Sequence, residues 1–288
     1  MKKQTACLLL SLFTALLCVA TALADMGPKD QLTVKVKNAP DCLYYLDILE
    51  VGPKRKYENL TKKERAALNG ALLSALEAAV PEGWHACLTQ GTGVPMWGKL
   101  AGETKNGQML HTFGYVGVPD TYRILIVTAE GESWVSEAYT RTALQSSVTV
   151  NWRDKSVTVP SHGRAYTVEF LFTLLPTLAI EALVLLLFRL GNKRNWVLFL
   201  AGNLITQLLV LLTLGRTAVL QGVGIGYYFL YVIVEAAVLA VELLLYRRLL
   251  TGCTKKRATA YAVTANLCSA AAGWFLAFPL WRWAVSLL

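Results

Sequence analysis

The sequence is poor in charged residues and in histidine. Charged residues make up 16% of its 288 residues, whereas about 25% is usual for a soluble domain. The three histidines, His85, His111 and His162, all precede the strongly apolar stretch that begins near Phe170. That stretch contains no His-Glu-x-x-His motif and no Ser-His or Cys-His pair. These absences count against histidine-based metal binding or nucleophilic catalysis in the apolar part of the chain.

Apolar residues are in excess, at 55% against about 45–50% in soluble domains. Residues 25–164 carry 16 Lys or Arg and 15 Asp or Glu, whereas the rest of the chain carries 12 and 4. The net charge of +9 therefore belongs to the N-terminus and to the breaks between apolar stretches. We expect no nucleic-acid partner, because nucleic-acid binding needs a basic stripe on a folded surface.

The first 24 residues have the three parts of a secretory signal peptide. Lys2 and Lys3 form a positive start, an apolar core follows, and Ala22-Leu-Ala24 is a cleavage pattern of small residues. A lipoprotein signal at Cys18 is disfavoured, because Leu17 precedes it where a small residue is required. An uncleaved leader, acting as an additional N-terminal anchor, stays open as an alternative.

Four later segments meet the length of about 20 apolar residues that a spanning helix needs. They are residues 167–188, 196–215, 226–246 and 259–281. The breaks at 189–195 and 247–258 contain eight Lys or Arg, whereas the second break and the C-terminal end contain one each. Because positively charged loops stay in the cytoplasm, we predict a multi-pass cell-membrane protein whose residues 25–165 and C-terminus are extracytoplasmic. The lipid bilayer is then its first partner, and other membrane proteins are candidate partners. Aromatic residues expected in interfacial belts are Trp196, Tyr227, Tyr228, Trp281 and Trp283.

Residues 25–165 are predicted to form one β-rich domain, an antiparallel sheet or sandwich with one inserted helix. The alternation over 31–37 and the apolar run over 43–51 indicate strands. Shorter strands are expected at 84–88, 109–116, 122–129, 133–137 and 147–152. Thr61 and Glu64 form a capping box that opens a helix over 62–80. The fold class is therefore a four-helix membrane bundle, residues 166–288, preceded by this domain.

Cys42 and Cys87 are the two cysteines of the outer domain. An even pair outside the cell predicts one disulfide between the second strand and the segment after the helix. Two separate buried thiols and a reactive His85-x-Cys87 pair are the alternatives, and the second of these would need a low-pKa thiolate.

Polar side chains inside the predicted spans are the sharpest functional signal. An ionisable group within a bilayer costs about 3 kcal/mol or more to insert and is a functional candidate by default. The candidates are Glu181, Asn203, Gln207, Glu235 and Glu242, with Thr206 and Asn266 nearby. Glu235 and Glu242 are seven residues apart and share a helix face. Glu181 and Asn203 have similar depths, from a rise of about 1.5 Å per residue.

Two interpretations of these polar residues stay open. The carboxyls can be protonated and hydrogen-bonded to Asn203, Gln207 or Asn266 as links between helices, with Glu242 reaching toward Arg247 or Arg248. Alternatively, they form a site for an ion, a proton or a small molecule. We expect no cofactor, and no metal is indicated, because glutamate alone does not select one.

Several motifs resemble those of a group of exported four-span membrane proteins of Gram-positive anaerobes. They are Tyr44-Tyr-Leu-Asp-Ile-Leu, Phe113-Gly-Tyr-x-Gly-Val-Pro119, Leu174-Leu-Pro-Thr-Leu-Ala-Ile-Glu181, Asn203-Leu-Ile-Thr206 and Glu235 followed by Glu242. The resemblance implies an exported bacterial four-span protein and carries over no activity and no functional residue.

Three functional hypotheses follow. The first is a non-enzymatic envelope protein whose outer domain binds a ligand or partner. The second is a small transporter or ion-pathway component that uses the intramembrane Glu and Asn residues, and the third is an intramembrane enzyme. One observation separates them: a pathway requires Glu181 and Glu235 to converge on a cavity, whereas purely structural links require packed, fully hydrogen-bonded carboxyls.

Overall fold

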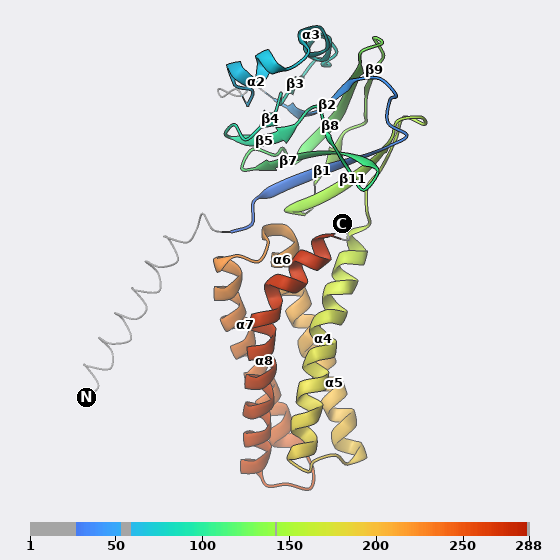
Figure 1. Cartoon of the computed structure of the whole chain (residues 1–288). Coiled ribbons are helices and arrows are strands. Elements are labelled where there is room, and N and C mark those ends of the chain that lie inside the picture. Colours follow the sequence, from blue (N-terminus) through green and yellow to red (C-terminus); the bar gives the residue numbers. More distant parts are fainter. Residues whose placement is uncertain (1–26, 53–58, 142, 287–288) are drawn as a thin grey trace, which may run out of the picture. The chain divides into compact units, whose positions relative to one another are not determined.

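The computed structural model describes residues 27–52, 59–141 and 143–286, so the predicted signal peptide lies outside the described residues. The chain divides into two compact units (Figure 1). The β unit comprises Lys29–His162, and the helical unit begins at Gly163. The predicted fold class, a helical membrane bundle preceded by a β-rich domain, is confirmed.

The β unit contains two sheets. The first has the order β12 (Ser156–Thr158), β11 (Gln145–Asn151), β1 (Asp30–Lys37), β7 (Gln108–Tyr115), β5 (Met96–Lys99) and β4 (Gln90–Gly91), with β6 (Glu103–Lys105) beside β7. The second has the order β10 (Tyr139–Thr140), β8 (Thr121–Thr128), β2 (Tyr44–Val51) and β3 (Trp84–Ala86), with β9 (Ser133–Val135) beside β8. The first sheet is mixed rather than antiparallel, because β1 pairs in parallel with β11.

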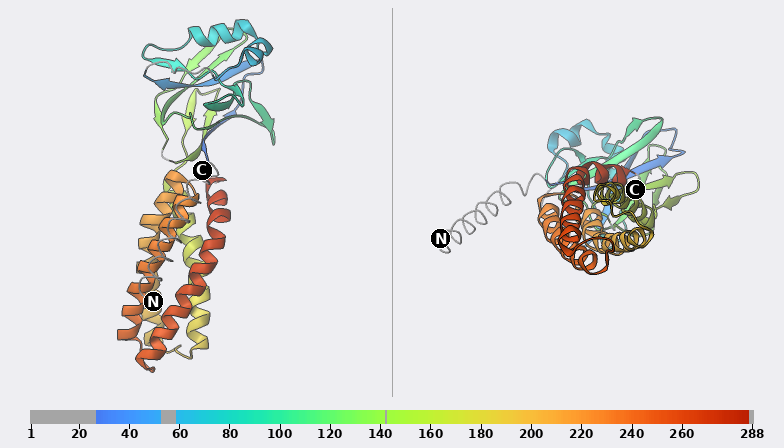
Figure 2. Two further views of the ribbon diagram at one scale, coloured as in Figure 1. Left: turned by 90° about the vertical axis from the view of Figure 1, so that its left-hand side faces the viewer. Right: turned by 90° about the horizontal axis from the view of Figure 1, so that it is seen from below.

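The sheets form a sandwich whose core comes from alternate residues of facing strands. Leu32, Val34 and Val36 of β1 belong to one buried cluster with Leu46 and Ile48 of β2. The other face of β2 is buried too, against α3 (Gly70–Ala78), which covers the second sheet (Figure 2). Burial on both faces explains why residues 43–51 read as a nearly continuous apolar run.

The predicted single helix over 62–80 is wrong in one respect, because it breaks in the middle. Thr61 and Glu64 do form the capping box that opens α2 (Lys62–Ala67). Leu68 is extended, however, and the Asn69 side chain accepts a hydrogen bond from the Leu72 N–H at 3.0 Å to cap α3. An asparagine followed by a glycine thus starts a second helix, since asparagine is a strong N-cap.

The predicted Cys42–Cys87 disulfide is not formed, and the strand register explains why. Cys87 lies beside Ile48, whose carbonyl accepts the Cys87 N–H at 3.1 Å. Cys42 precedes the start of β2, six residues from Ile48, which corresponds to about 20 Å of extended chain. A disulfide requires Cα atoms within about 7 Å, so the two cysteines are separate thiols.

The helical unit consists of α4 (His162–Leu187), α5 (Lys193–Val210), the π-helix η2 (Leu211–Gly215), α6 (Arg216–Gln221), α7 (Ile225–Leu249) and α8 (Lys255–Ser286). Among the described residues, four helical segments are long and apolar enough to cross a membrane. They are Tyr166–Leu187, Lys193–Gln221, Ile225–Leu249 and Lys255–Ser286. The chain is therefore that of an integral membrane protein.

The second span is longer than predicted. Gly215, expected at its end, has helical angles and lies where the π-helix joins α6. The helix instead ends at Gly222, whose φ of 74° is in the left-handed region that favours glycine. The break expected over the ten residues 216–225 is thus a short turn between Gln221 and Ile225.

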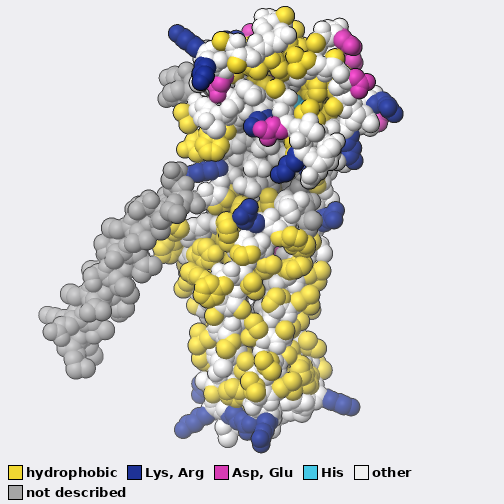
Figure 3. All heavy atoms as spheres, in the orientation of Figure 1, with side chains coloured by type: hydrophobic (Ala, Val, Ile, Leu, Met, Phe, Trp, Pro, Cys, Tyr) yellow, Lys and Arg dark blue, Asp and Glu magenta, His cyan; other side chains and the backbone are white. Residues whose placement is uncertain are grey.

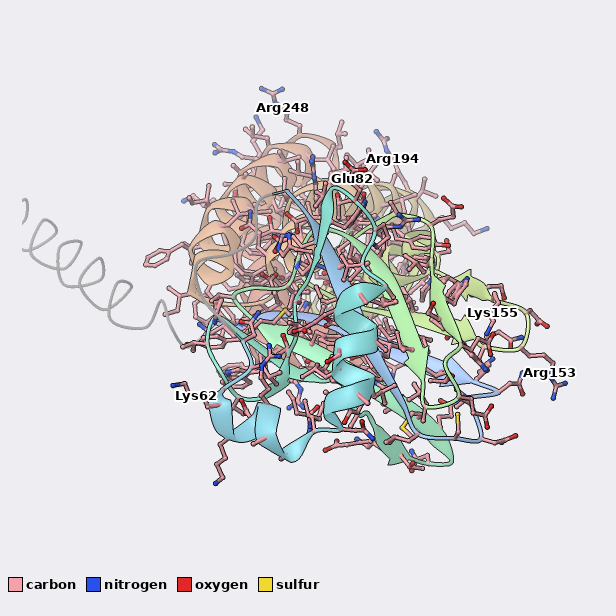
Figure 4. All side chains as sticks on the ribbon, turned by 90° about the horizontal axis from the view of Figure 1, so that it is seen from above. Lys62, Glu82, Arg153, Lys155, Arg194 and Arg248 are labelled. Carbon is pink, nitrogen blue, oxygen red and sulfur yellow. The ribbon has the colours of Figure 1, made fainter. Side chains whose placement is uncertain are left out.

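Lys and Arg side chains gather at one end of the bundle, which we call the basic end (Figure 3). The first and third breaks, which contain eight Lys and Arg, connect the spans at this end. Arg194 and Arg248 point away from the helices there (Figure 4). Buried Asn195 ties the two basic loops together: its amide donates to the Leu190 and Thr251 carbonyls at 2.9 and 3.0 Å. The opposite end of the bundle, where α4 and α7 begin, is called the cavity end, because a cavity between the spans extends toward it.

Candidate functional site

Buried polar side chains form one layer across all four spans. Glu181 of α4 accepts a hydrogen bond from the Asn203 amide of α5 at 2.9 Å. Its other carboxyl oxygen accepts from the Ser269 hydroxyl of α8 at 2.9 Å. Glu181 is 1% exposed, so the protein, not solvent, supplies both partners.

Glu242 of α7 repeats this arrangement. One carboxyl oxygen accepts from the Asn266 amide of α8 at 2.9 Å, and the other accepts from the Thr206 hydroxyl of α5 at 2.8 Å. Glu242 is also 1% exposed. The suggestion that it reaches toward Arg247 or Arg248 is therefore wrong, since its carboxyl is held within the layer.

The polar layer has an internal two-fold pattern. Each helical hairpin, α4–α5 or α7–α8, supplies one glutamate from its first helix and an Asn-x-x-Thr/Ser motif from its second. These motifs are Asn203-Leu-Ile-Thr206 and Asn266-Leu-Cys-Ser269. Each glutamate binds the Asn of its own hairpin and the hydroxyl of the other hairpin. Both hairpins start at the cavity end, so they form a parallel repeat of the kind found in some transporters.

A cavity of about 60 Å³ lies between the spans, from the polar layer toward the cavity end. A single water needs only about 10–15 Å³ measured in this way, so several waters or one small molecule fit. Its polar lining is Glu169, Thr173, Thr177, Glu181, Thr206, Gln207, Tyr227, Tyr231, Glu235, Glu242, Ser269 and Trp281. No Lys or Arg is among its lining residues.

All four acidic residues that follow residue 165 line this cavity. Glu181 and Glu242 are fully engaged in the polar layer. Glu169 and Glu235 are half-buried, and Glu235 lies beside the Tyr231 hydroxyl. Glu169 lies twelve residues before Glu181, which places it about 18 Å closer to the cavity end. Glu235 lies seven residues before Glu242, or about 10 Å closer to that end, so the carboxyls lie at three depths.

The cavity is shaped by irregular helical segments. Pro176, which lines it, lies inside α4 and cannot donate the usual backbone hydrogen bond. On the second span, the π-helix η2 contributes Leu214, and single-turn π segments are frequent at functional sites. Gly215 lies against Glu169, since a Cβ on Gly215 would be 3.6 Å from the Glu169 carboxyl carbon.

Two buried polar atoms at the cavity have no hydrogen-bond partner among the described residues. They are the side-chain oxygen of Gln207 and the indole nitrogen of Trp281. Both side chains are more than nine-tenths buried. The Gln207 amide nitrogen donates to the Thr177 hydroxyl at 3.3 Å. The cavity wall therefore offers one spare acceptor and one spare donor.

The structure brings all five predicted intramembrane residues to one region, but it divides their roles. Glu181, Asn203 and Glu242 belong to the hydrogen-bonded layer, whereas Glu235 and Gln207 line the cavity above it. The sequence hypotheses treated a cavity and packed, hydrogen-bonded carboxyls as alternatives. The structure contains both. Glu235 and Glu242 do share a helix face.

Sequence reasoning missed Glu169 and misplaced two aromatic residues. Tyr227 and Trp281, expected in an interfacial belt, are 7% and 5% exposed and line the cavity. Tyr227, Tyr231 and Glu235 recur at intervals of four residues, so their spacing was a usable signal for one helix face. Only four acidic residues follow residue 165, so Glu169 could have been recognised as a candidate from the sequence.

The carboxyls do not form a metal cage of protein ligands alone. Within the described residues, no three His, Cys, Asp or Glu side chains are placed to hold a metal ion together. The four carboxyls instead line the cavity at separate depths.

Comparison of the chain with protein-family models, with curated proteins and with solved structures found no match. The functional conclusion therefore rests on the geometry of the polar layer and the cavity.

Proposed function

We propose that the helical unit is the cation-binding part of a small transporter or ion pathway, and that the cavity is its binding site. The observation that carries this proposal is the convergence of Glu169, Glu181, Glu235 and Glu242 on one cavity without a Lys or Arg in its lining. Carboxyls inside a bilayer are costly, and unneutralised carboxyls attract a proton or another cation.

Two further features support this proposal. The polar layer lies where two parallel helical hairpins meet, which is where transporters with internal repeats bind their substrates. The proline and the π-helix at the cavity wall weaken the regularity of two spans. Irregular backbone at membrane depth is tolerated where it lines a cavity.

The test is ion flux into liposomes that contain the purified full-length protein. We expect flux of protons or of K⁺ above that of empty liposomes, reduced at least tenfold in Glu235→Gln. Glu130→Gln, in the exposed β8–β9 turn, is the matched control and should leave flux unchanged. Equal flux with and without the protein, at normal incorporation, would contradict the proposal.

The orientation of the chain is part of this proposal. With the basic end in the cytoplasm, as eight positive charges at that end favour, the cavity end and residues 25–165 face outward. Single cysteines in place of Lys193 and Glu130 provide the test, in a variant from which all six native cysteines, including Cys7 and Cys18 of the leader, are removed. A membrane-impermeant thiol reagent should label position 130 in intact cells and should reach position 193 only after lysis.

A second candidate function concerns the β unit, which in this proposal binds a partner through an aromatic pair that consists of exposed Trp97 and half-buried Tyr115. Trp97 and Tyr115 stack at 4.8 Å between ring centroids, and Trp97 is 44% exposed. Val94 and Val116 beside them in sequence are 65% and 60% exposed. Trp97→Ala should then abolish in-cell crosslinking of a partner to this patch without altering ion flux, and an unchanged crosslinking pattern would count against this role.

A further inference from the structure

The cavity chemistry distinguishes among classes of cation. A bare inorganic cation is satisfied by oxygen ligands alone, and it can accept no hydrogen bond. Trp281 and Gln207 both line the cavity, and among the described residues the Trp281 indole N–H has no acceptor and the Gln207 side-chain oxygen has no donor. Because a buried donor or acceptor without a partner is unfavourable, the complementary ligand carries both a donor and an acceptor.

The remaining lining favours an organic rather than a strongly hydrated ligand. Aromatic side chains of Phe172, Tyr227 and Tyr231 line the cavity together with Trp281, and aromatic rings attract ammonium groups. Apolar residues of η2 and α8, including Leu214 and Leu276, complete the wall. Small-molecule sites commonly combine such a wall with a few placed polar groups.

We propose that the cavity binds a small primary ammonium compound that also carries a hydrogen-bond acceptor, of which an amino alcohol is the simplest case. The ammonium group pairs with the Glu235 carboxyl, and its remaining N–H bonds reach Gln207. The acceptor receives the Trp281 N–H. This inference rests on the proposed cation-binding function and specifies its ligand.

The first experiment compares ligands on the unmodified full-length protein in detergent by isothermal titration calorimetry. The probes are ethanolamine, ethylamine, ethylene glycol and K⁺. Ethanolamine should bind roughly fivefold to tenfold more tightly than ethylamine, which corresponds to one additional hydrogen bond. Ethylene glycol, which lacks the charge, should show no binding. Equal affinity for the two amines would overturn the inference.

Two variants then assign the contacts. Trp281→Phe keeps an aromatic ring but removes the N–H, so it should erase the difference between ethanolamine and ethylamine. Glu235→Gln should weaken both amines at least tenfold, and Glu130→Gln should weaken neither. Circular dichroism checks that each variant is folded. A preserved preference for ethanolamine in folded Trp281→Phe would contradict the assigned donor.

The same ammonium chemistry occurs in a free solute and in the headgroup of phosphatidylethanolamine. Competition of ethanolamine binding by short-chain phosphatidylethanolamine, but not by phosphatidylcholine, would assign the ligand to a lipid. Competition by neither lipid would assign it to a free solute, and either result supports the proposed chemistry. Proton or K⁺ flux without any amine binding would refute this inference and leave the proposed function intact, whereas absence of both would refute the two together.

Discussion

The β unit and the helical unit distribute polar and apolar residues in opposite ways. In the β unit, Leu46 and Phe113 are fully buried. In the helical unit, Leu187 and Phe275 are 71% and 77% exposed, while Glu181 is 1% exposed. The difference follows from the surroundings of each unit: water drives apolar side chains inward, whereas lipid accepts them and leaves polar groups to pair inside.

Both units bury carboxyls, but they satisfy them differently. Asp47 of β2 accepts the Leu88 N–H at 2.8 Å, and its second oxygen has no partner among the described residues. Glu181 and Glu242 each have partners at both oxygens. Of these three buried carboxyls, the two in the helical unit therefore have the more complete set of hydrogen bonds.

The largest expected effect tests whether apolar side chains are buried in the β unit and lipid-facing in the helical unit. Leu46→Ala should destabilise the β unit by about 2–5 kcal/mol, because it opens a cavity in a packed core. Leu187→Ala, the same substitution on the exposed face of α4, should change stability by less than about 0.5 kcal/mol, as for surface sites generally. Chemical denaturation of the full chain in micelles measures both. A large loss at position 187 would show that this face is a protein contact rather than a lipid-facing surface.

The polar layer provides the next test. Glu181→Leu removes the acceptor for Asn203 and Ser269 and should cost about 1–3 kcal/mol. Glu181→Gln keeps one side-chain oxygen as an acceptor and has a polar amide nitrogen in place of the other. It should therefore lower stability by less than about 1 kcal/mol. Because of the two-fold pattern, Glu242→Leu and Glu242→Gln should follow the same order in SDS-induced unfolding. If the Leu variant is the more destabilised of the two at one position but not at the other, the two hairpins are not equivalent.

Two buried groups of the β unit should give opposite pH dependences. Burial raises the pKa of Asp47 from 3.8 to about 7, so its contribution to stability is complete below pH 3.8 and is lost as pH rises toward 7. Burial lowers the pKa of His111 from 6.5 to about 4, so its contribution is complete above pH 6.5 and is lost as pH falls toward 4.

In the unmodified protein these two trends oppose each other between pH 4 and 6.5. Asp47→Asn should expose the histidine trend, so that stability falls on acidification by about 1–3 kcal/mol. His111→Gln should expose the opposite trend. Hydrogen exchange of β2 and β8 amides in the full chain reports both slopes, and parallel slopes in the two variants would refute the assignment.

The smallest effect concerns the break between α2 and α3. Asn69→Ala removes the side chain that caps α3 and should cost about 1 kcal/mol. Leu68→Ala, at the neighbouring half-exposed position, is the control for loss of side-chain contacts. Faster hydrogen exchange confined to the first turn of α3 in Asn69→Ala is the expected signature, and exchange rates equal to those of the control would exclude the cap.

Local patterns in the sequence were sufficient to predict several helices and strands. Thr61 and Glu64 predicted the start of α2, and the alternation over 31–37 predicted β1. Other features needed contacts between distant segments. The break at Leu68 depends on the Asn69 cap, whose N–H also donates to the Tyr45 hydroxyl at 2.7 Å. The distance between Cys42 and Cys87 depends on the pairing of β2 with β3.

The sequence by itself determined four apolar stretches, a β-rich unit before them and the rarity of acidic residues within them, because composition and periodicity are properties of short windows. Only the tertiary structure decided that Glu181 pairs with Ser269, 88 residues away, and that Glu169 and Tyr227 face one cavity. The faces that helices present to one another are set by packing, since a uniformly apolar span carries no amphipathic stripe to orient it.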